Sequence, residues 1–177
     1  MSMSRTLIVL VALGLAPSPC LAEGFGIGKP VAEADVAPWD ITIFPDGTGL
    51  PPGGGTPAQG LKIYNEKCVM CHAEGGKGNA SPTASPLIGD APLTGLNSPK
   101  TIRNYYPYST ILFDYIRRAM PYTSPRSLTN DEVYALTAWI LSINKLIGEN
   151  DAMDAKTLPA VKMPNRDGFI VAYPDRI

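Results

Sequence analysis

The sequence predicts an all-α domain of three main helices, flanked by two extended arms. Two observations support this prediction. Apolar residues recur at helical spacing in three stretches, and two of these stretches open with a capping box. Only one short run, residues 38–44, alternates as a strand would. We therefore expect a signal segment at 1–22, an N-terminal arm at 23–55, a helical domain at 56–148 and a C-terminal arm at 149–177.

The first 22 residues have the pattern of a cleaved export signal. Arg5 precedes an apolar run at residues 7–16, which is shorter than the ~20 residues needed to span a bilayer. Cys20 and Ala22 are small residues at the two positions that a signal peptidase recognises. We expect cleavage after Ala22, export to the periplasm and no stable membrane association. A lipid anchor on Cys20 is the alternative, which the preceding Pro19 disfavours.

Composition and charge exclude several classes of protein. The formal net charge is −1, which does not favour binding to nucleic acid or to a membrane surface. We find no Ser/His/Asp set and no P-loop, so the chain alone is not expected to be a catalyst. Cleavage after Ala22 would leave Cys68 and Cys71 as its cysteines. Free thiols are unusual in an oxidising compartment, so this pair calls for an explanation.

The segment before the first helix is rich in proline and glycine. Residues 45–55, PDGTGLPPGGG, cannot sustain a helix or a long strand. We expect an extended arm that lies on the chain's own surface or on a partner's. A disordered linker is the alternative, and Trp39 and Phe44 argue against it.

The first helix begins at a strong N-terminal signal. Thr56 is the cap, Pro57 suits the first turn and Gln59 completes a capping box. One face of this helix then carries Leu61, Tyr64 and Cys68. The helix is expected to run to about Cys71 and to present the motif KCVMCH, residues 67–72, at its end.

Two further helices follow a loop at residues 74–101. The second is expected over residues 109–120 and is stopped by Pro121. Its apolar face carries Ile111, Leu112, Tyr115, Ile116 and Ala119. The third opens with a capping box, Thr129 to Glu132, and is expected to continue to Gly148.

The motif KCVMCH could hold zinc, a reactive disulfide or a haem. A zinc site takes four protein ligands, or three and water, and no second ligand cluster exists here. A thioredoxin-like CxxC begins a helix after a strand, whereas this pair ends a helix. Cysteines three residues apart can form thioethers with one porphyrin, and the histidine that follows can reach its iron. The motif therefore predicts one covalently attached haem c, held by Cys68 and Cys71 with His72 as the proximal iron ligand.

The distal ligand is limited by composition, because His72 is the only histidine in the sequence. The remaining options are a methionine, another side chain, water or no ligand. After removal of the signal the methionines are Met70, Met120, Met153 and Met163. The first lies between the two thioethers, and the last two lie in the C-terminal arm. We expect Met120 to be the distal ligand, with core packing as the alternative role. His/Met ligation raises the potential and suits electron transfer.

The order of these elements resembles the class I cytochrome c fold: a helix ending in CxxCH, a loop, a helix leading to Met-Pro, and a C-terminal helix. In that family a small residue and an aromatic residue precede the first cysteine by eight and four positions. Gly60 and Tyr64 occupy these positions here. The resemblance implies that they pack against Leu136 and Trp139 of the last helix, where ordinary core packing is the alternative reading.

The family also carries a proline whose carbonyl accepts the ring N–H of the proximal histidine. The segment SPLIGD, residues 85–90, is similar, although Pro86 is one residue nearer to Gly89 than is usual. The resemblance implies the Pro86 carbonyl as the acceptor for His72. Such a bond orients the ligand and tunes the iron.

A narrower resemblance covers three segments: WDITIFPDGTGLPPGGGT (39–56), YIRRAMPYTSPRSLTNDEVYALTAWIL (115–141) and LPAVKMPNRDGF (158–169). They are similar to the cytochrome c subunit of sulfite or sulfane dehydrogenases of the bacterial sulfur-oxidising system. The resemblance implies a molybdenum-containing catalytic subunit as electron donor, arms that wrap this partner, and a downstream cytochrome c or oxidase as acceptor. A free diffusible carrier and a haem enzyme with an open distal site are the alternatives.

Five polar residues near the expected haem are candidates for binding a propionate: Arg103, Tyr105, Tyr106, Arg117 and Arg118. Arg117 and Arg118 could instead steer the docking of a partner. Decoration of a solvated surface is the alternative for all of them.

Overall fold

The computed structural model describes residues 28–170 except 79–80 and 82–83. The chain divides into two compact units, residues 1–40 and 41–177. In the first unit, helix α2 (Glu33–Val36) buries none of its residues, and Trp39 is 77% exposed. The expected signal segment lies outside the described residues. No helix in the described ranges is long and apolar enough to cross a membrane.

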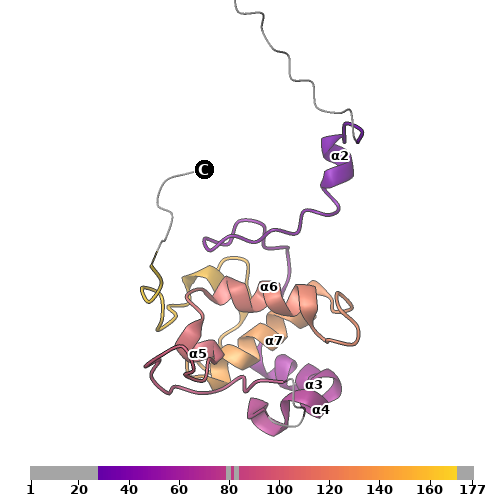
Figure 1. The fold of residues 1–177 in the computed structure, drawn as a ribbon. Helices are drawn as coiled ribbons and strands as arrows, with labels where there is room; N and C mark the ends of the chain where they lie inside the picture. The colour runs from indigo at the N-terminus through magenta and orange to yellow at the C-terminus, as the bar shows by residue number, and fades with distance from the viewer. Residues whose placement is uncertain (1–27, 79–80, 82–83, 171–177) are drawn as a thin grey trace, which may run out of the picture. The chain divides into compact units, whose positions relative to one another are not determined.

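The second unit is mainly helical, as predicted (Figure 1). Its elements are β1 (Gly54–Gly55), α3 (Pro57–Lys67), α4 (Val69–His72), η1 (Glu74–Gly76), α5 (Ile102–Tyr105), α6 (Ser109–Ala119), α7 (Asn130–Ile143), β2 (Met153–Asp154) and η2 (Leu158–Ala160). The three long helices α3, α6 and α7 correspond to the three that the sequence predicts.

Both predicted capping boxes are present. Thr56 accepts from the Gln59 amide at the start of α3, and its own amide donates to the Gln59 side chain at 2.8 Å. Thr129 and Glu132 make the same reciprocal pair at the start of α7. A third box, Thr101 with Asn104, begins α5, a short helix that the sequence did not predict between the expected loop and the second expected helix.

Two helix ends differ from expectation. Helix α3 stops at Lys67 because Cys68 has φ −126° and ψ −32°, and the motif continues in the separate short helix α4. Helix α7 ends at Ile143 rather than at Gly148. Lys145 adopts a left-handed φ of 57°, a conformation that terminates helices.

Helix α7 lies between α3 and α6 and forms the centre of the core (Figure 1). On the α3 side, a Cβ on Gly60 would lie 2.0 Å from the Ala135 carbonyl oxygen, so the two backbones nearly touch. The rings of Tyr64 and Trp139 have centroids 4.0 Å apart, as the family resemblance implies. Leu136 is buried in the same core, but the atoms nearest Gly60 belong to Ala135 and Trp139.

The described parts of both expected arms within residues 41–170 pack on this core. Strands β1 and β2 pair antiparallel, with Gly55 opposite Met153. Tyr134 of α7 donates to the Pro51 carbonyl at 2.8 Å, and Ser109 of α6 donates to the Leu158 carbonyl at 2.6 Å. These stretches therefore make hydrogen bonds within their own chain.

Candidate haem site

The two cysteines of the motif lie on one turn around helix α4. Both are free thiols; Cys68 is half-buried and Cys71 is exposed. Burial raises the pKa of Cys68 to about 11, although Lys67 acts in the opposite direction. A redox-active CxxC needs a lowered thiol pKa, so the environment of Cys68 opposes that reading. Two unpaired thiols on one turn fit attachment to the two vinyl groups of a porphyrin.

His72 ends helix α4, and its ring is held from one side. Its Nδ1 lies 3.4 Å from the carbonyl oxygen of Ser85. The family resemblance implied the carbonyl of Pro86; the structure places the preceding carbonyl there instead. The Leu87 amide donates to the Gly76 carbonyl at 2.8 Å, which fixes the register of this segment beside the motif. With Nδ1 donating to Ser85, Nε2 of the ring is free to bind a metal.

The four candidate methionines differ in the exposure of their side chains. Met70 is 85% exposed, while Met153 and Met163 are 4% and 3% exposed and belong to the core. Met120 is half-buried and packs against the core at the end of α6. Helix α6 stops there because Met120 adopts an extended backbone and Pro121 follows. Met120 as the distal ligand stays a prediction, and its partial exposure is compatible with it.

The donor set and the surrounding side chains fit a haem. Among the described residues, the candidate site offers the thiols of Cys68 and Cys71, the imidazole of His72 and the half-buried thioether of Met120. Apolar side chains from several elements pack against the core while remaining partly exposed, among them Val69, Leu87, Tyr106, Met120 and Ile143. A porphyrin is a large apolar plate, and burying such surfaces contributes about 25 cal/mol per Å².

Two of the three arginines proposed for propionates, Arg103 and Arg118, have hydrogen-bond partners within the chain. Arg103 donates to the Asn144 carbonyl at 2.5 Å. Arg118 pairs with Asp114 at 2.7 Å and donates to the Ile41 carbonyl at 2.8 Å. These contacts favour a structural role for both residues, while contact with a propionate stays a prediction.

The two adjacent tyrosines of this group differ in their surroundings. The ring of Tyr105 stacks edge-on against Phe169 with centroids 5.4 Å apart. Burial raises the pKa of Tyr106. Tyr106 also packs against the hydrophobic core.

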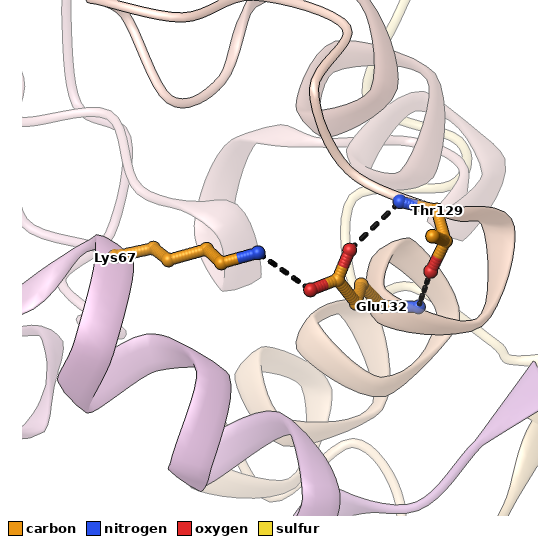
Figure 2. A network of polar contacts seen from close by, with 3 residues as sticks. All are labelled: Lys67, Thr129 and Glu132. Carbon is orange, nitrogen blue, oxygen red and sulfur yellow. Dashed lines mark hydrogen bonds and ion pairs between the residues drawn. The ribbon is translucent and has the colours of Figure 1, made fainter.

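A polar network missed by the sequence analysis braces the start of the motif (Figure 2). Lys67, directly before Cys68, pairs with Glu132 of α7 at 2.5 Å, while Glu132 also closes the capping box with Thr129. The hydrogen bond from Lys67 holds the pKa of Glu132 below its usual value. The capping box could be recognised in the sequence, but nothing there links it to a lysine 65 residues away. The Ser85 carbonyl was missed because a backbone acceptor leaves no residue-type signal.

The comparisons with known proteins agree with this site. The cytochrome c family model matches residues 57–144. A solved structure, the sulfane dehydrogenase SoxCD from Paracoccus pantotrophus, matches with 34% identity and a TM-score of 0.74, covering 86% of this chain and 73% of that one. No curated protein matches the sequence.

Fold, motif and comparisons together define a haem protein that transfers electrons. The chain belongs to the cytochrome c family, and its fold is that of class I. Membership implies a covalently bound haem c. The CxxCH site at Cys68 and Cys71 fits its attachment.

Proposed function

We propose that this chain is the periplasmic mono-haem cytochrome c subunit of a sulfite or sulfane dehydrogenase. It accepts electrons from a molybdenum-containing catalytic subunit and passes them to a downstream cytochrome c or oxidase. The observation that supports this most is the extent of the match to SoxCD. A match over 86% of the chain extends well beyond residues 57–144, so the likeness includes the flanking segments and not just the haem fold.

In this proposal each site residue has one task. Cys68 and Cys71 hold the haem by thioether bonds, His72 is the proximal ligand and Met120 the distal one. The bound haem supplies uptake and release of one electron at a time. The Ser85 carbonyl orients the His72 ring, and the apolar surroundings keep water away from the iron.

Export belongs to the same proposal. The apolar run at residues 7–16 and the small residues at 20 and 22 support cleavage after Ala22. The mature protein would then act in the periplasm, where a molybdenum-containing partner would meet it.

One observation favours a second candidate, a free diffusible electron carrier. The described stretches 41–55 and 149–170 make hydrogen bonds within the chain itself, as a protein that acts alone would require. Transient redox encounters bury little surface. A carrier of this kind would use the same haem site with a different donor.

A native pull-down of the tagged protein from its own periplasm separates these candidates. The eluate is assayed for molybdenum and for haem reduction after addition of sulfite or of a protein-bound sulfane. A molybdenum-containing partner with prompt reduction supports the proposal, and the donor that works identifies the substrate. A cytochrome that retains no partner contradicts it and leaves the diffusible carrier.

A further inference from the structure

Asn144, the residue that follows α7, is buried and uses its side chain as a double donor. Its Nδ2 lies 2.9 Å from the Ile140 carbonyl, one turn back in the helix, and 2.9 Å from the Leu87 carbonyl, 57 residues earlier. Because two carbonyl oxygens face this atom, it must be the nitrogen of the amide. Among the described residues, Asn144 Oδ1 has no hydrogen-bond partner, so the side chain acts as a donor alone.

Leu87 is thereby held from both sides. Its carbonyl accepts from Asn144, and its amide donates to Gly76 at 2.8 Å. Gly76 belongs to the turn that follows the haem motif, and in the same turn the Gly78 amide donates to the His72 carbonyl at 2.8 Å. The segment around Leu87 is therefore fixed between the motif and the end of α7.

The acceptor for His72 lies two residues before this anchor. The Ser85 carbonyl oxygen is 3.4 Å from His72 Nδ1. Pro86 joins the two residues, and its ring fixes φ and also restricts the residue before it. Because these backbone torsions are restricted, a displacement of Leu87 would also displace the Ser85 carbonyl.

We propose that Asn144 is a positioning residue for the proximal haem ligand. By holding Leu87, it keeps the Ser85 carbonyl where it accepts the His72 ring proton. This inference rests on the proposed function, in which His72 binds the iron. A hydrogen bond from Nδ1–H makes the imidazole a stronger electron donor and stabilises ferric iron. Loss of the anchor should therefore weaken that bond and raise the reduction potential.

The chain offers a matched pair of variants. In Asn144→Ser the hydroxyl can still bond to the Ile140 carbonyl, as serine does toward the preceding turn, but it is too short to reach Leu87. In Thr137→Val the buried bond from Thr137 to the Val133 carbonyl, 2.7 Å long, is lost from the same helix. Among the described residues, the Thr137 hydroxyl bonds to the Val133 carbonyl and not to the Leu87 segment, so this variant reports the cost of a lost helix bond alone.

The experiment uses the haem-loaded full chain and three readouts: haem content, reduction potential, and the proton NMR signal of His72 Nδ1–H in the ferrous state. We expect N144S to retain haem, to show an upward shift in potential and to move the ring-proton signal. T137V should lower the unfolding temperature without either change. A loaded N144S with an unchanged potential and ring-proton signal overturns the inference.

Two further outcomes are informative. If N144S does not fold, solvent exchange in the wild-type protein decides the question. Slow exchange of the Asn144 side-chain protons and of His72 Nδ1–H supports the anchor, and fast exchange of both overturns it. A wild-type protein without covalent haem contradicts the proposed function itself, and is thereby distinguished from a failure of the inference alone.

Discussion

The interface between α3 and α7 differs in construction from the segment that follows α3, residues 68–89. The interface joins two regular helices whose backbones meet at Gly60 and Ala135, with the Tyr64 and Trp139 rings stacked beside them. The segment contains a four-residue helix, a 3₁₀ turn and several residues with left-handed backbone: Ala73, Gly75, Gly76, Gly78 and Gly89. Two regular helices in close contact form the first region, whereas the second consists of short, irregular turns.

This difference separates the region that stabilises the fold from the region that we propose binds the haem. The helix interface supplies the scaffold, and the irregular segment carries Cys68, Cys71 and His72, the residues that we propose hold the haem. Among the described residues, two side-chain hydrogen bonds join them: Tyr64 donates to the Ala73 carbonyl, and the Asn144 side chain donates to the Leu87 carbonyl. Variants in one region should therefore leave the measured property of the other largely intact.

The largest effect is expected from C68A/C71A in the irregular segment. Without the two thiols no thioether can form, so covalent haem should be absent. Haem that remains with the polypeptide after denaturing electrophoresis measures this directly. M70L, between the two cysteines and 85% exposed, is the control and should retain haem fully. Covalent haem in the double variant would contradict the assignment of the site.

Gly60→Ala tests the helix interface. The new Cβ would lie 2.0 Å from the Ala135 carbonyl oxygen, so the helices must separate. We expect a loss of about 3 kcal/mol in the free energy of unfolding, despite the gain in helix propensity. Denaturant unfolding followed by circular dichroism measures it. Gly95→Ala is the control, because a Cβ there meets nothing within 4 Å. Equal stability of the two variants would show that the close approach is absent in solution.

Met120→Ala tests whether Met120 is the distal ligand of the haem iron. Removing the thioether should lower the reduction potential on the order of 0.1 V, a part of the range that axial ligands span. The ferrous haem should also bind added ligands such as carbon monoxide. Redox titration and absorption spectra report both changes, and Met70→Leu should show neither. A potential and ligand affinity equal to the wild type would exclude Met120 as the ligand.

The smallest effect is expected at the ion pair between Lys67 of α3 and Glu132 of α7. Glu132→Gln keeps the capping box but removes the charge that pairs with Lys67. Because both side chains are partly exposed, we expect a loss of about 0.5 kcal/mol at neutral pH.

The pH dependence of that loss follows from the Glu132 pKa. Lys67 holds this pKa below the usual 4.5 in the folded state, so the stabilisation is complete above about pH 4.5. It is lost as the pH falls through the lower folded-state value. Unfolding free energies of the wild type and E132Q should therefore converge in acid. A difference that persists undiminished at low pH would assign the effect to something other than the charge.

The sequence predicted the regular parts well because their signals are local. The boxes at Thr56 and Thr129 and the apolar periods gave three helices that the structure contains. The break at Cys68 and the short helix α5 were missed, since four-residue elements carry too few residues for a period.

Within the site, residue types gave the cysteines, the histidine and the candidate methionines. The parts that could not be predicted are contacts between distant segments. The Ser85 carbonyl, the pair of Lys67 with Glu132 and the reach of Asn144 to Leu87 all depend on how the loop returns to the helices. No local pattern encodes that return.

The central claim is that this chain by itself supplies both axial ligands of one haem. Near-infrared magnetic circular dichroism of the purified ferric protein tests it most directly, because the band positions distinguish His/Met from bis-histidine and from water ligation. The account predicts a single haem with His/Met ligation. Bis-histidine ligation would contradict it, since His72 is the only histidine in the sequence and the second would have to come from another molecule.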